Sequence, residues 1–140
     1  MQFLIDTHCW LWAVKSSERL LPSAAQLIES ESSVVRFSAI SALEIAIKVS
    51  IGKLQLSDSP QDFVLSQMSA LSVVSLPVTF SHALHVASLP LLHRDPFDRL
   101  LVAQAQVEGI PLMTADETIA AYDVEIIWAG RSPAPNRPPN

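Results

Sequence analysis

Cysteine and positive charge are both scarce in this 140-residue sequence. The single cysteine, Cys9, excludes an internal disulfide framework and a cysteine-rich zinc site, so a bound metal ion would have oxygen ligands. Lys and Arg number 9 against 14 Asp and Glu, which gives a net charge of −5. This balance argues against a generic basic surface for nucleic acid, because such surfaces neutralise phosphates with Lys and Arg. It leaves open a phosphate bound through a metal ion.

Long hydrophobic runs are also missing. No apolar run reaches the roughly 18 residues of a membrane-spanning helix, and Asp6 interrupts the N-terminal stretch where a signal peptide would stay apolar. We therefore expect a cytoplasmic protein without membrane association. The 49% hydrophobic content suits one globular domain. We expect that domain over residues 1–130 and a flexible tail over 131–140, which holds four of the ten prolines.

Short β-rich segments alternate with helical segments along the chain. The pattern predicts strands at 2–6, 34–39, 72–77, 110–116 and 124–128. Helices are expected between them at 7–14, 22–32, 41–54, 60–71, 79–92 and 95–108. Such alternation indicates βαβ units, and therefore an α/β fold whose parallel sheet is covered on both faces.

Two acids stand where predicted strands end. Asp6 ends the first strand, and Asp116 follows the strand that contains Met113. In open α/β sheets, functional sites form beyond the carboxyl ends of the strands. Each of these acids could instead only cap the helix that follows it, since Asp is common at that position. The residues alone leave both interpretations open.

Glu44 falls within an apolar stripe of its predicted helix. The stripe consists of Ile40, Leu43, Ile47 and Ile51. An acid on a core-facing stripe indicates a functional role. The alternative is a salt bridge to Lys48 one turn later, which stabilises a helix by only about 0.2–0.5 kcal/mol. The opposite side, with Ile45 and Val49, is also apolar, so which face is buried stays open.

The stretch "RDPFDRLL" begins another helix with two acids. Asp95 suits the N-cap and Pro96 the first helical position, so we interpret Asp95 as structural. Asp98 lies on the same face of the predicted helix as apolar residues, whereas an acid that only supported the cap would gain more from solvent. These neighbours are Leu101, Val102 and Ala105. We therefore interpret Asp98 as functional.

The combination of acids is more informative than each acid alone if all of them meet at one edge of the sheet. They are Asp6, Glu44, Asp98 and Asp116. Two carboxylates about 4 Å apart repel by roughly 4 kcal/mol at an effective dielectric constant near 20. Marginal stability does not tolerate several such repulsions, so the acids must bind protons or share a cation. A set of carboxylate oxygens selects Mg²⁺ or Mn²⁺ rather than zinc.

Four ordered stretches together resemble the PIN-domain family, and specifically the VapC-type toxins of type II toxin-antitoxin modules. They are "FLIDTHCWLW", "SALEIAIKVSIGKL", "HRDPFDRLLVAQA" and "PLMTADETIAAY", and the resemblance extends over residues 2–128. It implies a three-layer α/β/α fold with a central, mostly parallel sheet of four to five strands. It also implies a ribonuclease that depends on Mg²⁺ or Mn²⁺, with RNA as substrate, a cognate antitoxin as partner, and assembly as a homodimer or higher oligomer.

The resemblance carries the family's four acids to Asp6, Glu44, Asp98 and Asp116. We expect Asp6 and Asp98 to be direct metal ligands, and Glu44 and Asp116 to hold water molecules around the ion. Cleavage would leave 5′-phosphate and 3′-hydroxyl ends. Further candidates for contacts with the ligands or the substrate are Thr7, Arg99, Thr114 and Asp95.

Two other functions compete with the nuclease. A catalytically silent PIN-like protein or RNA-binding module would be expected to have lost some of the acids, whereas all four are present. A receiver-like phosphoacceptor domain is also doubly wound, but it would need an additional acidic pair near the start and a lysine after the last strand. Neither is present.

Overall fold

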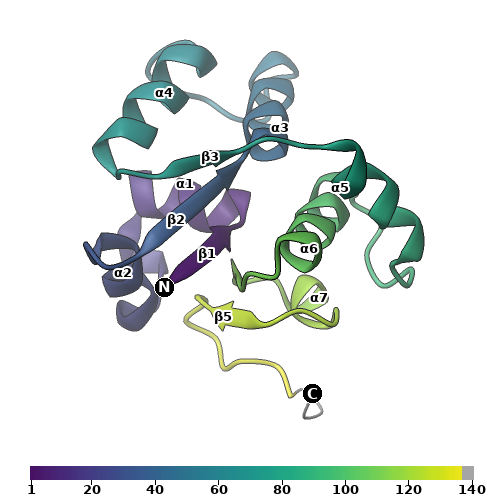
Figure 1. Ribbon diagram of the computed structural model, residues 1–140. Coiled ribbons are helices and arrows are strands. Elements are labelled where there is room, and N and C mark those ends of the chain that lie inside the picture. Colours follow the sequence, from purple (N-terminus) through teal and green to yellow (C-terminus); the bar gives the residue numbers. More distant parts are fainter. Residues whose placement is uncertain (137–140) are drawn as a thin grey trace.

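The computed structural model describes residues 1–136, which form one sheet with helices on both faces (Figure 1). The strands are β1 (Gln2–Ile5), β2 (Val34–Ser38), β3 (Val74–Leu76), β4 (Leu112–Thr114) and β5 (Ile126–Trp128). They pair in the order β3-β2-β1-β4-β5, and every pair is parallel. The predicted parallel sheet of four to five strands is therefore confirmed.

The helices are α1 (Thr7–Lys15), α2 (Pro22–Glu29), α3 (Ala39–Ser50), α4 (Pro60–Ala70), α5 (Phe80–His85), α6 (Pro96–Glu108) and α7 (Glu117–Ala120). Two short 3-10 helices, η1 (Ser17–Arg19) and η2 (Val86–Ser88), follow α1 and α5. The helix expected at 79–92 thus ends before Pro90, which has no backbone N–H to continue it. None of the helices in the described part of the chain has the length and apolarity of a membrane span.

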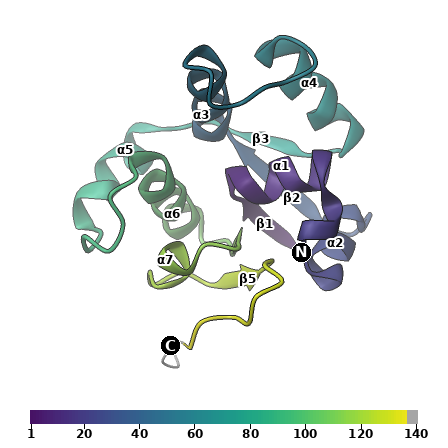
Figure 2. The ribbon, with the colours of Figure 1, turned by 180° about the vertical axis from the view of Figure 1, so that it is seen from behind.

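Alternating side chains of β1 divide the core into two parts. Phe3 and Ile5 pack with α1, α2, α3 and α4 on one face, and Leu4 packs with α6 and α7 on the other. Figure 2 shows α1 in front of β1 and β2 when the molecule is seen from behind. The arrangement confirms three layers, with the sheet in the middle.

Several helices begin at the carboxyl edge of the sheet. β1 leads through Asp6 into α1, and β4 leads through Asp116 into α7. These two strands are adjacent and parallel, so both residues lie at the same edge. α6 begins at Pro96 after its N-cap Asp95, and its last turn ends at Gly109 with a left-handed φ of 66°.

The buried face of α3 is not the predicted stripe of Ile40, Leu43, Ile47 and Ile51. The prediction that this stripe faces the core is therefore wrong. Leu43 and Ile51 are 49% and 58% exposed, whereas Ser41, Glu44 and Ile45 are buried. α3 follows β2 without a loop, so the direction of the strand fixes how the helix is rotated. The side with Ile45, which the sequence left as the other possibility, therefore faces inward.

The chain after β5 contacts η1 and β5 through residues 131 and 132. Arg131 Nε donates to the backbone oxygen of Glu18 at 2.7 Å, and Trp128 Nε1 donates to that of Ser132 at 2.8 Å. Residues 137–140 lie outside the described part of the chain, and the flexibility expected for 131–140 stays a prediction.

Candidate metal centre

Asp6 is placed by the end of β1 and is only 2% exposed. Its Oδ1 accepts a hydrogen bond from the backbone N–H of Cys9 at 2.7 Å, which caps α1. Its Oδ2 accepts a hydrogen bond from Thr114 Oγ1 at 2.5 Å. Burial raises the pKa of Asp6, although these hydrogen bonds oppose the effect. Asp6 is thus a helix cap and also a buried acid at the carboxyl edge.

Asp116 also caps a helix, at the end of β4, but its side chain is 40% exposed. Its Oδ1 accepts from the backbone N–H groups of Thr118 at 2.7 Å and Ile119 at 3.4 Å, which caps α7. Its own N–H donates to Thr114 Oγ1 at 3.0 Å. Thr114 therefore contacts both acids, because the same hydroxyl donates to Asp6. Asp116 Oδ2 takes no part in the cap.

Glu44 is 1% exposed on the inward face of α3. Its Oε2 accepts from Lys48 Nζ at 2.7 Å, so the salt bridge considered as an alternative does form. Its Oε1 is buried and has no hydrogen-bond partner within residues 1–136. Leaving a buried acceptor unpaired costs about 1–3 kcal/mol. Such an oxygen is suited to a cation ligand or to a water molecule held near one.

Asp98 lies in the first turn of α6 and is 8% exposed. Its pKa is raised to about 8, chiefly by burial and then by the charges of Asp95, Glu44, Asp6 and Asp116. The other three predicted acids are therefore all close enough to influence Asp98. Asp95 Oδ1 accepts from the N–H groups of Phe97 and Asp98, as its interpretation as the N-cap requires.

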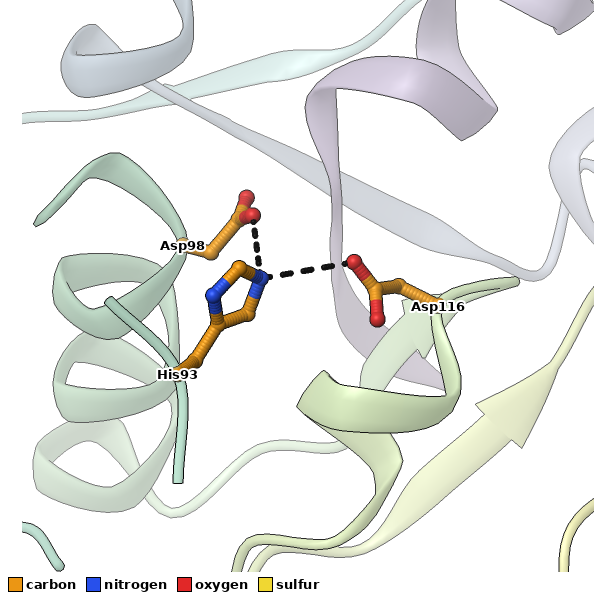
Figure 3. A group of neighbouring side chains, drawn as sticks. All are labelled: His93, Asp98 and Asp116. Carbon is orange, nitrogen blue, oxygen red and sulfur yellow. Dashed lines mark ion pairs between the residues drawn. The ribbon is translucent and has the colours of Figure 1, made fainter. Parts of the chain in front are cut away.

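His93 completes the cluster and was not among the residues predicted from the sequence. Its Nε2 lies 3.0 Å from Asp98 Oδ2 and 3.5 Å from Asp116 Oδ2 (Figure 3). These three residues each offer one ligand atom, all within 4.8 Å of one another. The available signal was the position of a histidine two residues before Asp95, inside the motif that carries Asp98.

The other predicted contact residues lie around the cluster in different ways. Thr7 Oγ1 donates to Ser41 Oγ at 2.8 Å and so links α1 to α3. Arg99 donates to the backbone oxygens of Pro90 at 2.9 Å and Val86 at 3.2 Å. The expected contact of Arg99 with a substrate phosphate therefore gains no support from its hydrogen bonds.

The residues fit a small divalent cation. Their free atoms are carboxylate oxygens, which Mg²⁺ and Mn²⁺ prefer, and Glu44 Oε1 is a buried oxygen without a partner in the described residues. Burial disfavours the charged forms of Asp6 and Asp98, and the charges of the neighbouring acids add to this effect at Asp98. A cation among them would reverse the sign of that interaction.

Comparisons with known proteins agree with this architecture. The family model described as PIN domain matches residues 3–125. The structure is similar to a chain of VapBC2 from Rickettsia felis, solved bound to a DNA fragment from their promoter, at 13% identity and a TM-score of 0.70, covering 92% of this chain and 99% of that one. It is also similar to DNA-bound VapBC from Salmonella typhimurium, at 16% identity and a TM-score of 0.61, covering 91% and 97%.

A third similar structure is VapBC-1 from nontypeable Haemophilus influenzae, with 16% identity, a TM-score of 0.59, and coverage of 91% of this chain and 97% of that one. Comparison with curated proteins gave no match. At these identities, the likeness to solved structures is a likeness of fold.

Proposed function

Because the chain belongs to the PIN domain family, we propose that it is a metal-dependent endoribonuclease. The proposed active site consists of Asp6, Glu44, Asp98 and Asp116. The observation that supports it most strongly is the pairing of two features: the raised pKa of Asp98, caused in part by the other three acids, and the buried Glu44 oxygen without a partner in the described residues.

Asp6 and Asp98 are the proposed ligands of Mg²⁺ or Mn²⁺. Both are nearly inaccessible to solvent, and both have pKa values that burial raises, so a cation would favour their charged forms. When bound, such an ion makes a water molecule more acidic and offsets negative charge on a phosphodiester.

Glu44 and Asp116 are the proposed acceptors for water. Each has one oxygen already engaged, with Lys48 or with the N-terminus of α7, and a second oxygen outside those hydrogen bonds. An acceptor fixed in this way can orient an attacking water molecule and receive its proton. Thr114 supports the arrangement because its hydroxyl joins Asp6 to the backbone of Asp116.

We further propose that the protein is the toxin of a VapBC-like toxin-antitoxin module, with a cognate antitoxin protein as partner and a homodimer or higher oligomer as its assembly. The support is the family membership and a fold shared with chains from VapBC complexes. RNA is the proposed substrate, bound through the metal rather than through a basic surface, since the net charge is −5.

The nuclease proposal is tested by incubating EDTA-treated protein with end-labelled RNA, with and without Mn²⁺ or Mg²⁺. We expect cleavage only with metal, 5′-phosphate product ends, and loss of cleavage in Asp98→Asn. Asp58→Asn is a matched control, because Asp58 is exposed in the loop before α4. Full activity of Asp98→Asn would contradict the site. Metal binding without cleavage of any RNA would favour the silent PIN-like module.

The toxin role is tested by inducing expression without the partner. Growth should stop with the natural sequence and continue with Asp98→Asn. Unimpaired growth with active, folded protein in the cell would contradict the toxin role.

A further inference from the structure

The four acids differ in what holds them in place. Three of them have an oxygen fixed by a dedicated hydrogen-bond donor: Asp6 by Thr114, Glu44 by Lys48, and Asp116 by the backbone of α7. Within residues 1–136, no hydrogen bond of this kind reaches the Asp98 carboxylate from a backbone or side-chain donor. Its contact is with the ring of His93, whose Nε2 lies 3.0 Å from Asp98 Oδ2.

The hydrogen bonds of the His93 ring determine which nitrogen carries its proton. Nδ1 accepts a hydrogen bond from the backbone N–H of Asp95 at 3.2 Å, so Nδ1 has no proton. In the neutral ring the proton is then on Nε2. A protonated Nε2 is a hydrogen-bond donor and has no lone pair for a metal ion, which argues against His93 as a ligand.

We propose that His93 is a positioning residue that orients the Asp98 carboxylate, and with it the adjacent oxygen of Asp116, for the metal ion. This inference rests on the proposed function, because it assigns a role at the same site. Figure 3 shows the His93 ring between the two carboxylates, with Nε2 toward both. Nε2 is buried and has no well-aligned hydrogen bond within residues 1–136, but it lies 3.0 Å from Asp98 Oδ2 and 3.5 Å from Asp116 Oδ2, so its N–H acts on both carboxylates through proximity.

The backbone of His93 is also held by a hydrogen bond. The N–H of His93 donates to the hydroxyl of the buried Tyr122 at 2.9 Å. Arg99 donates to the same hydroxyl at 3.1 Å and to the backbone oxygens of Val86 and Pro90. These bonds connect the segment before α6 to α6 itself and to the turn after α7. Arg99, one residue after Asp98, thereby fixes the loop that presents His93.

The test is the affinity of EDTA-treated protein for Mn²⁺, measured from the electron paramagnetic resonance signal of the free ion. His93→Leu should weaken binding by about 10- to 100-fold, the usual effect of removing a group that orients a metal ligand. His93→Gln should restore most of the affinity, because its amide nitrogen reaches the position of Nε2. His93→Asn, whose amide is too short to reach it, should not.

His85→Leu is the matched control. His85 lies on α5 and its Nε2 contacts Gln106 Oε1 at 2.7 Å, away from the acids. It should bind Mn²⁺ like the natural protein. If His93→Leu fails to fold, as judged by circular dichroism, the comparison of His93→Gln with His93→Asn decides the matter.

Two results would overturn the proposal. One is unchanged Mn²⁺ affinity in both His93→Leu and His93→Asn. The other is a strong ¹⁴N coupling to bound Mn²⁺ in pulsed resonance spectra that disappears in His93→Leu, since that would make His93 a ligand. Failure of the natural protein itself to bind Mn²⁺ would instead contradict the proposed function, so the two failures are distinguishable.

Discussion

Replacing Asp98 by Asn should stabilise the metal-free protein while removing its activity. The substitution keeps the shape of the side chain and eliminates a charge that burial and four neighbouring carboxylates disfavour. One pKa unit corresponds to about 1.4 kcal/mol. A change from the ordinary value of 3.8 to about 8 therefore lowers the free energy of unfolding by roughly 4 kcal/mol at pH 7. We expect Asp98→Asn to recover about half or more of that amount.

The pH dependence gives the sign of the effect. Folded protein keeps the Asp98 proton up to about pH 8, whereas unfolded protein loses it near 3.8. Between these values the folded state binds more protons, so its stability falls as the pH rises. The stability that protonated Asp98 contributes is fully present below about pH 4 and lost by about pH 8. Burial raises the pKa of Asp6 too, so Asp6 changes stability in the same direction.

The assay is urea unfolding in EDTA at pH 5, 7 and 8, followed by circular dichroism. Asp98→Asn should gain most over the natural protein at pH 8 and least at pH 5. Asp58→Asn, at an exposed position, should follow the natural protein at every pH. If Asp98→Asn were no more stable than the natural protein at pH 8, and had the same pH dependence, the charge of Asp98 would not be destabilising. That result would refute the reasoning.

Two further substitutions test how the site is supported. Thr114→Val removes the hydroxyl that joins Asp6 to the backbone of Asp116. It should lower the free energy of unfolding by about 1–3 kcal/mol and the rate of metal-dependent cleavage about tenfold. Thr114→Ser keeps the hydroxyl and should retain both stability and activity, and an equal loss in the two variants would contradict the role of the hydroxyl. Ile45→Ala should lower the free energy of unfolding by about 2–5 kcal/mol because Ile45 is fully buried, whereas Leu43→Ala should change it far less. The reverse order in denaturant unfolding would show that α3 is rotated the other way.

The alternation of strands and helices could be read from the sequence because each element carries its own period and its own stops. Gly109 ends α6 and Asp95 caps it, as local chemistry predicts. The four acids could also be found, since two follow strands and two interrupt apolar helical surfaces. Capping does not exclude the proposed role: Asp6 and Asp116 each use one oxygen for a helix, and the second oxygen takes no part in the cap.

Two features depended on tertiary structure and were not available from local patterns. The inward face of α3 is set by the direction of β2, so a stripe with Leu43 looked as suitable as the side with Ile45. His93 lies in a loop without periodicity, and its position between Asp98 and Asp116 depends on a hydrogen bond from its backbone to Tyr122, 29 residues later. No local pattern specifies such a contact.

The central claim is that one divalent cation makes the four carboxylates, three of them buried, compatible. Anomalous diffraction from crystals grown with Mn²⁺ tests it most directly. The account predicts a manganese peak bounded by Asp6, Glu44, Asp98 and Asp116. A site without manganese at millimolar concentration, with Glu44 Oε1 bonded only to water, would contradict it.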